Sequence, residues 1–136
     1  MTEKSKTYFL RDQMPAVVWA ILIFIASSIP ANDFPDLTIF QYDKLIHLII
    51  FLIFGLLIYR AFNLFWETGI FSYSRALVTL LTVAVYGILD EFHQQYVPGR
   101  TPDIWDATAD ALGGIVGVIL IYIFASKERQ QERTIK

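Results

Sequence analysis

The amino-acid sequence predicts an all-α polytopic membrane protein, a bundle of four transmembrane helices with both termini cytoplasmic. Hydrophobic residues make up 55% of the 136 residues and charged residues only 18%, whereas about a quarter of a soluble domain is charged. Four apolar runs alternate with polar segments, and those segments differ strongly in their content of lysine and arginine. This pattern is typical of a chain that crosses the membrane several times.

The four predicted spans follow the apolar runs and cover residues of about 14–30, 44–62, 75–95 and 102–125. The first ends at Pro30, because a proline disfavours helical backbone at the residue before it. A spanning helix needs about 20 residues. The third and fourth runs reach this length only if the polar stretches EFHQQY and PDIWDATAD extend them. We therefore expect polar side chains to enter the membrane at one end of the bundle.

We expect one transmembrane domain, residues 1–126, followed by a polar cytoplasmic tail, residues 127–136. The basic N-terminus resembles the start of a signal peptide, but three later spans favour a retained signal anchor. The absence of cysteine excludes disulfides, thiolate nucleophiles and thiolate metal sites. The net charge of -2 argues against a nucleic-acid partner, since binding to nucleic acid requires a dense basic patch.

The distribution of positive charge predicts the orientation of the spans in the membrane. Nine lysine and arginine residues lie before the first span, between the second and third, and after the fourth, whereas two lie in the other loops. The excess of positive charge marks the cytoplasmic side, so the first and third loops are expected outside. Reporter fusions after residues 36, 68, 99 and 130 test this topology. An external signal at residue 130 would contradict it.

The ionisable residues at the outer ends of the spans are candidates for a functional site. Asp43 and His47 are four residues apart at the start of the second span, so they share a helix face. A carboxylate beside an imidazole can fix its tautomer and suits acid–base chemistry or metal binding. The alternative is an acid that stabilises the helix start and a histidine with a structural role. Lys44 lies on another face and is expected to anchor the helix at the interface.

Glu91 and Gln94 continue one face of the third span at its outer end. A glutamate at the bilayer centre costs roughly 2–3 kcal/mol unless it is paired, and less at the interface, so Glu91 is expected to have a partner. The alternative is a solvated helix end. Asp90, His93 and Gln95 lie on other arcs of the helix and are expected to be solvated.

The segment VPGR at 97–100 predicts a turn, in which Pro98 fixes φ and Gly99 supplies a positive φ. The turn would direct Arg100 back over the helix ends, where an arginine can bind a carboxylate or a phosphate. A lipid-headgroup anchor is the alternative. We expect Thr101 to be the N-cap of the fourth helix, with Pro102 at its first position.

Acidic and small residues share one face of the fourth span, namely Asp103, Asp106, Asp110, Gly113, Gly114 and Gly117. The helix dipole would explain Asp103, but Asp106 and Asp110 lie deeper. Two carboxylates four residues apart cannot both be charged and unpaired in a dry site. Either one is protonated, or Arg100, His47 or a bound cation compensates their charge. The glycines allow a neighbouring helix to approach closely.

Together these stretches resemble the VanZ-like family of small bacterial membrane proteins. The matching segments are SSIP at 27–30, DKLIH at 43–47 and GILDEFHQQYVPGRTPDIWDATADALGGIVG at 87–117. The resemblance implies a polytopic inner-membrane fold and, from the founding member, reduced susceptibility to the lipoglycopeptide teicoplanin. It implies no established reaction. The family usually has asparagine in place of Asp110 and commonly tyrosine in place of Phe51. Its patterned polar positions correspond to Asp43, Lys44, His47, Glu91, Gln94, Arg100, Asp106 and Asp110.

Two functions are compatible with these residues. In the first, the eight polar positions form an outward-facing pocket of a non-catalytic envelope protein. That pocket would bind a lipid headgroup, a cell-wall precursor or a lipoglycopeptide. In the second, the chain is a membrane enzyme that acts on a lipid-linked, phosphate-bearing substrate at the outer leaflet. Its acid or base would then be Glu91, His47 or Asp43.

No organic cofactor is predicted, and a divalent cation held by Asp106, Asp110 and Glu91 is left open. The lipid bilayer is the expected partner, and a homo-oligomer through Gly113 and Gly117 is a further alternative. A channel or transporter needs polar residues along the full depth of the membrane. The inner halves of the predicted spans are apolar, which disfavours this function for a single protomer.

Overall fold

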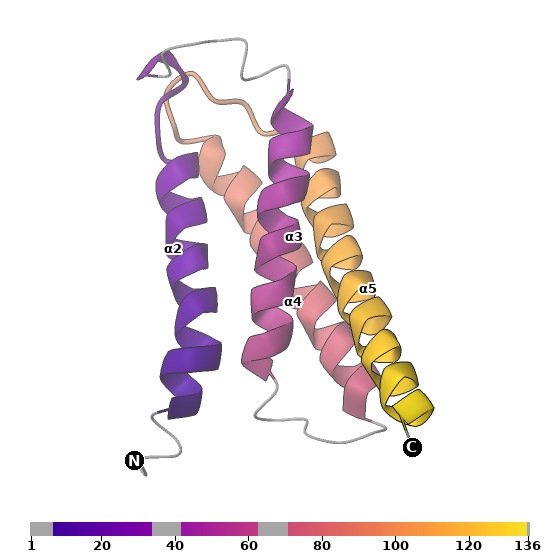
Figure 1. The fold of residues 1–136 in the computed structure, drawn as a ribbon. Helices are drawn as coiled ribbons and strands as arrows, with labels where there is room; N and C mark the ends of the chain where they lie inside the picture. The colour runs from indigo at the N-terminus through magenta and orange to yellow at the C-terminus, as the bar shows by residue number, and fades with distance from the viewer. Residues whose placement is uncertain (1–6, 34–41, 63–70, 136) are drawn as a thin grey trace.

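The structure is a computed structural model that describes residues 7–33, 42–62 and 71–135. It contains a π-helical turn at Phe9–Gln13, helix α2 at Met14–Ser27, a 3₁₀ turn at Ala31–Asp33, α3 at Asp43–Ala61, α4 at Phe71–Gln94 and α5 at Ile104–Ile135. No β-strand occurs in these described ranges. Figure 1 shows α2 beginning and α5 ending at the same end of the bundle.

Four helical segments are long and apolar enough to cross a membrane: Phe9–Ser27, Asp43–Ala61, Tyr73–Gln94 and Ile104–Lys127. The predicted all-α class and the four spans are therefore confirmed. The first span starts earlier than predicted because Asp12 is buried, with an exposed fraction of 3%. One of its carboxylate oxygens accepts hydrogen bonds of 2.9 Å from Nε of both Arg11 and Arg60. This pairing lets polar residues form part of the helix before Met14.

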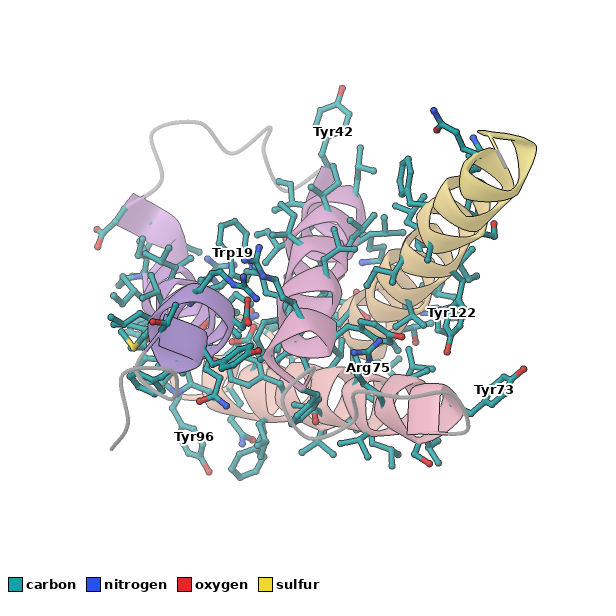
Figure 2. The ribbon with its side chains drawn as sticks, turned by 60° about the horizontal axis from the view of Figure 1, so that its bottom comes forward. Trp19, Tyr42, Tyr73, Arg75, Tyr96 and Tyr122 are labelled. Carbon is teal, nitrogen blue, oxygen red and sulfur yellow. The ribbon has the colours of Figure 1, made fainter. Side chains whose placement is uncertain are left out.

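One end of the bundle, here called the polar end, is formed by the carboxyl ends of α2 and α4 and the amino ends of α3 and α5. At the opposite end, Arg75 donates a hydrogen bond of 2.8 Å to the hydroxyl of Tyr59, and its guanidinium lies 4.0 Å from that ring's centroid. Figure 2 shows Arg75 turned into the bundle, whereas Tyr73 and Tyr96 point away from it.

Glycines bring the backbones of α3 and α5 together. A Cβ atom at Gly113 would overlap the backbone oxygen of Leu48, and one at Gly117 would lie 2.8 Å from the backbone oxygen of Leu52. The predicted close approach of a neighbouring helix thus occurs within the chain. Gly113 and Gly117 are both buried in this contact.

The core is small, and a large part of the apolar surface points outward. Ile23, Phe51, Phe54 and Val83 form the buried cluster. The face of α5 opposite its aspartates is exposed, with exposed fractions of 66% for Trp105, 48% for Leu112 and 50% for Ile119. Aliphatic and aromatic side chains on this face suit contact with lipid rather than with water.

Helix α5 begins at Ile104, later than predicted. The carboxylate of Asp103 accepts a hydrogen bond of 2.9 Å from the backbone N–H of Trp105, and its carbonyl accepts the first helical bonds. The N-cap is therefore Asp103 and not Thr101, because the aspartate side chain satisfies a free N–H of the first turn. The helix continues through Ile135, so the predicted tail extends α5.

Candidate functional site

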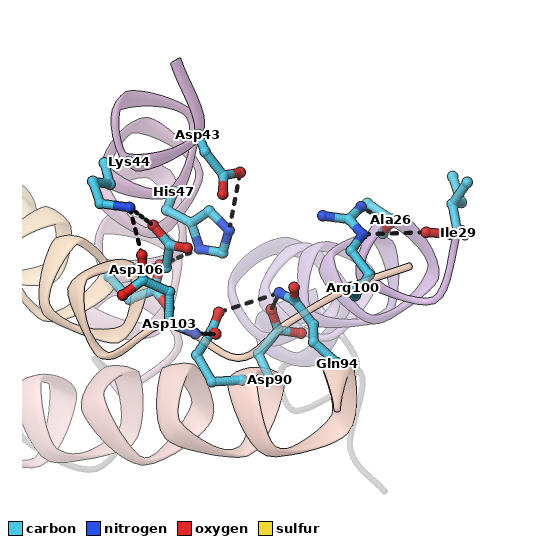
Figure 3. Close-up of polar contacts among 12 residues, drawn as sticks. Ala26, Ile29, Asp43, Lys44, His47, Asp90, Gln94, Arg100, Asp103 and Asp106 are labelled. Carbon is cyan, nitrogen blue, oxygen red and sulfur yellow. Dashed lines mark hydrogen bonds and ion pairs between the residues drawn. The ribbon is translucent and has the colours of Figure 1, made fainter. Parts of the chain in front are cut away.

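The polar residues predicted from the sequence meet at the polar end around His47 (Figure 3). One ligand-type atom from each of Asp43, His47 and Asp106 lies within 4.8 Å of the other two. The same is true of His47, Glu91 and Asp110. The five side chains come from α3, α4 and α5. His47 belongs to both groups.

The imidazole of His47 is held by Asp110 rather than by Asp43. Its Nδ1 lies 2.9 Å from Oδ1 of Asp110, within hydrogen-bond distance, whereas its Nε2 lies 3.8 Å from Oδ1 of Asp43. The side chain of Asp110 has no exposed surface, and its Oδ2 has no hydrogen-bond partner. Gly87 faces this carboxylate, because a Cβ atom there would lie 2.7 Å from Oδ2. Close helix packing therefore brings a deep carboxylate to the histidine.

Lys44 compensates the acids at the start of α5, which corrects its expected role as an interface anchor. Its Nζ donates hydrogen bonds of 2.7 Å to Asp103 and 3.1 Å to Asp106. Since α3 and α5 both begin at the polar end, the long lysine side chain reaches across from one to the other. The ammonium group of Lys44 also holds the pKa of Asp103 below its ordinary value.

Replacing Lys44 with methionine is expected to lower the melting temperature of the purified protein. The substitution leaves Asp106 buried, with an exposed side-chain fraction of 6%, and without its ammonium partner. Adding Asp106→Asn should recover much of the loss, because coupling within a pair appears as non-additivity. Arg100→Gln combined with Asp106→Asn is the control pair. Equal recovery in both pairs would contradict the assignment of Lys44 as the partner.

Glu91 and Gln94 join the end of α4 to the start of α5. Oε2 of Glu91 accepts a hydrogen bond of 2.7 Å from the backbone N–H of Asp103. The amide of Gln94 donates bonds of 3.2 Å to Glu91 and to Asp90. The expected partner of Glu91 is therefore a backbone group together with Gln94. Both oxygens of Glu91 take part in these bonds.

Two residues expected to be solvated belong to the packed part of the polar end. Asp90 has an exposed fraction of 5%, and its spacing of four residues from Gln94 is the signal that could have identified it. Nε2 of His93 lies 3.0 Å from Oγ of Ser28, and its ring lies 4.6 Å from that of Phe24. Gln95 is exposed as expected.

The predicted turn is present and directs Arg100 over a helix end. Gly99 has a φ of 77°, and the N–H of Arg100 donates to the carbonyl of Val97. The guanidinium lies 3.3 Å from the carbonyl oxygen of Ile29 and 3.4 Å from that of Ala26. Arg100 therefore interacts with the carboxyl end of α2 (Figure 3), where a cation is favoured by the helix dipole.

A cavity of about 140 Å³ lies beside this cluster. Its polar lining residues are Ser27, Asp43, His47, Asp90, Gln94 and Arg100. Its apolar lining residues are Ile23, Ala26, Ile46, Ile50 and Phe51. Four of the eight predicted site residues thus line the cavity: Asp43, His47, Gln94 and Arg100. The other four, Lys44, Glu91, Asp106 and Asp110, belong to the cluster but not to the lining. The cavity is much larger than the space that one water molecule occupies.

Comparison with known proteins agrees with the motifs. A family model described as VanZ/LLP1 matches residues 14–125. No curated protein and no solved structure matches the chain. The matched range includes most of each of the four apolar helices and the whole polar cluster. This multi-pass membrane protein belongs to the VanZ/LLP1 family.

Proposed function

We propose that this protein binds the anionic headgroup of a cell-envelope amphiphile in the cavity at the polar end. The observation that carries the proposal is that both polar and apolar side chains line the cavity. Asp43, His47 and Arg100 line it together with aliphatic side chains such as Ile46 and Ile50. Such a site offers hydrogen bonds and charge to a headgroup and apolar contact to the start of its hydrocarbon chain.

Arg100 is the group best suited to recognise the anion. Its guanidinium remains charged at every physiological pH and can bind a phosphate or carboxylate with two hydrogen bonds. Arg100 is one of the residues that line the cavity, so an anion bound there would lie beside it. Candidate ligands are an ordinary phospholipid, a lipid-linked cell-wall precursor and a lipoglycopeptide.

The proposed place of action is the outer face of the inner membrane. This assignment combines the positive-inside orientation predicted from the sequence with the family membership. Binding of a precursor or of the antibiotic at this face would lower susceptibility to teicoplanin. Survival of a suitable host expressing the protein in the presence of teicoplanin therefore tests the cellular role.

Filling the cavity is expected to abolish ligand binding. Ile46→Trp places an indole in the cavity, and Leu45→Trp is the matched control because Leu45 points outward with an exposed fraction of 53%. Native mass spectrometry of the detergent-purified protein would measure binding of phosphatidylglycerol, a polyprenyl phosphate and teicoplanin. We expect Ile46→Trp to weaken binding of the preferred probe at least about tenfold, by the loss of close contacts. Equal binding by both variants would contradict the proposal.

The pairing of His47 with Asp110 favours one alternative function, hydrolysis of a lipid-linked phosphate ester. A buried carboxylate that orients an imidazole, with the other ring nitrogen free for substrate or water, is the arrangement of a general base. Product release from a radiolabelled polyprenyl diphosphate tests this alternative. His47→Gln should then lower the rate of product release roughly 10²- to 10⁴-fold. A protein that only binds its ligand would release no product, with or without this substitution.

A further inference from the structure

We infer that Asp43, His47 and Asp106 form a divalent-cation site at the edge of the cavity, with Asp110 as the residue that orients His47. The cation would bridge the protein and the anionic headgroup, so this part of the inference rests on the proposed function. Binding of the cation itself depends only on the three side chains and can be measured without any lipid.

The donor set is that of a divalent cation. One atom from each of the three side chains lies within 4.8 Å of the others. Rotation of these side chains toward a common ion would bring the three atoms to a ligand distance of about 2.0–2.2 Å. Two carboxylates and one imidazole suit Mn²⁺ or Zn²⁺, because carboxylates favour Mn²⁺ and imidazole favours Zn²⁺. Figure 3 shows His47 between Asp43 and Asp106.

The contact between Asp110 and His47 prepares the imidazole as a ligand. With Asp110 ionised and His47 neutral, Oδ1 of Asp110 accepts the N–H of Nδ1 at 2.9 Å. The lone pair is then on Nε2, the nitrogen on the side of Asp43. Histidines that bind metals usually donate their second ring nitrogen to a carboxylate in this way, which fixes the tautomer and the orientation of the ring.

A buried carboxylate oxygen next to His47 lacks a hydrogen-bond partner. Oδ2 of Asp110 is buried without a hydrogen-bond partner, in a side chain with no exposed surface. Among the described residues near it, the acids are Asp43, Asp90, Glu91, Asp103, Asp106 and Asp110, and the basic groups are Lys44, Arg100 and the imidazole of His47. A cation bound to Nε2 of His47 would polarise the ring toward Asp110 and reduce this excess of negative charge.

The cavity supplies the remaining coordination positions. Asp43 and His47 both line it, so an ion between them faces open space. Water or a headgroup oxygen can occupy that space. Lys44 lies on the outer side of Asp106 and holds its Oδ1 at 3.1 Å, which positions this carboxylate. Metal sites that act on a ligand commonly keep such open positions.

Electron paramagnetic resonance of Mn²⁺ added to the detergent-purified full chain tests the inference. We expect one Mn²⁺ per chain, displaced by Zn²⁺. His47→Gln and Asp43→Asn should each weaken binding at least about tenfold. His93→Gln and Asp33→Asn are matched controls outside the cluster and should bind as the unmodified chain does. Asp110→Asn keeps the shape of the side chain and should weaken binding about tenfold through the orientation of His47.

Absence of stoichiometric binding of either metal would overturn the inference, as would equal losses in the His47 and His93 variants. Gel filtration of each variant identifies those that fail to fold. If the His47 or Asp43 variant fails to fold, metal binding by Asp110→Asn tests the site instead. Unchanged metal binding by Asp110→Asn would contradict the site. If the metals do not bind but Ile46→Trp still abolishes headgroup binding, the cation site is wrong and the proposed function stands. If the metals bind and no headgroup probe binds, the cation site stands and the proposed function is wrong.

Discussion

Replacing His47 with leucine is expected to lower the free energy of unfolding by on the order of 3 kcal/mol, the usual cost of removing one partner of a buried polar pair. The substitution leaves Asp110 fully buried without its hydrogen bond of 2.9 Å. Because Oδ2 of Asp110 already has no partner, the whole carboxyl group would then be unpaired. Thermal unfolding in detergent, followed by circular dichroism, measures the loss.

The double variant His47→Leu with Asp110→Asn separates this cause from simple loss of packing. A neutral amide costs less to bury than an unpaired carboxylate, so the double variant should be more stable than His47→Leu alone. His93→Leu is the matched control, since His93 lies at the same end and contacts Ser28 instead. A loss of equal size in the His93 variant would show that Asp110 is not the reason.

Replacing Gly113 with valine should be at least as damaging, at about 3 kcal/mol or more. Even the first added carbon would overlap the backbone oxygen of Leu48 and would lie 2.8 Å from the backbone nitrogen of Leu52. Backbone atoms cannot turn aside as a flexible side chain can, so α3 and α5 must separate. We expect a lower melting temperature. The molecules that still fold should bind the headgroup probe more weakly in the cavity at the polar end.

Leu112→Phe is the control for this prediction, because it adds volume to the adjacent residue on the outward face, where Leu112 has an exposed fraction of 48%. Gly113→Ala should give an intermediate loss. A melting temperature for Gly113→Val equal to that of Leu112→Phe would show that the contact between α3 and α5 is looser than the structure indicates.

The four spans could be predicted from the sequence because membrane insertion depends on length and hydropathy, which are local properties of the chain. The polar face of the fourth span could be predicted because helical periodicity places Asp106, Asp110 and Gly113 on one side. The turn at Gly99 followed from the need for a positive φ. Helix ends were less predictable, because burial of Asp12 and capping by Asp103 replaced the starts that the apolar runs suggested.

Pairing between helices could be predicted only in part. The sequence offered Arg100, His47 or a cation as the partner of Asp106 and Asp110, and His47 does contact Asp110. Lys44, which was not among these alternatives, contacts Asp103 and Asp106, while Arg100 contacts the end of α2. Spacing along one helix favoured Asp43 as the partner of His47, whereas the imidazole lies within hydrogen-bond distance of Asp110 on α5. Both differences arise because these residues are far apart in the chain. Helical periodicity predicts the face on which a side chain lies, but it does not predict which residue of another helix that side chain reaches.

The sequence alone thus determined the number of spans, the side of each helix that is polar, and the identity of the glycines that allow close packing. These features depend on composition and on a repeat of 3.6 residues. The tertiary structure decided which acid each base contacts, that Asp90 is buried, and that a cavity adjoins His47. Those features depend on the distance and rotation between packed helices, since a shift of one helical turn would exchange one aspartate for another beside the same imidazole.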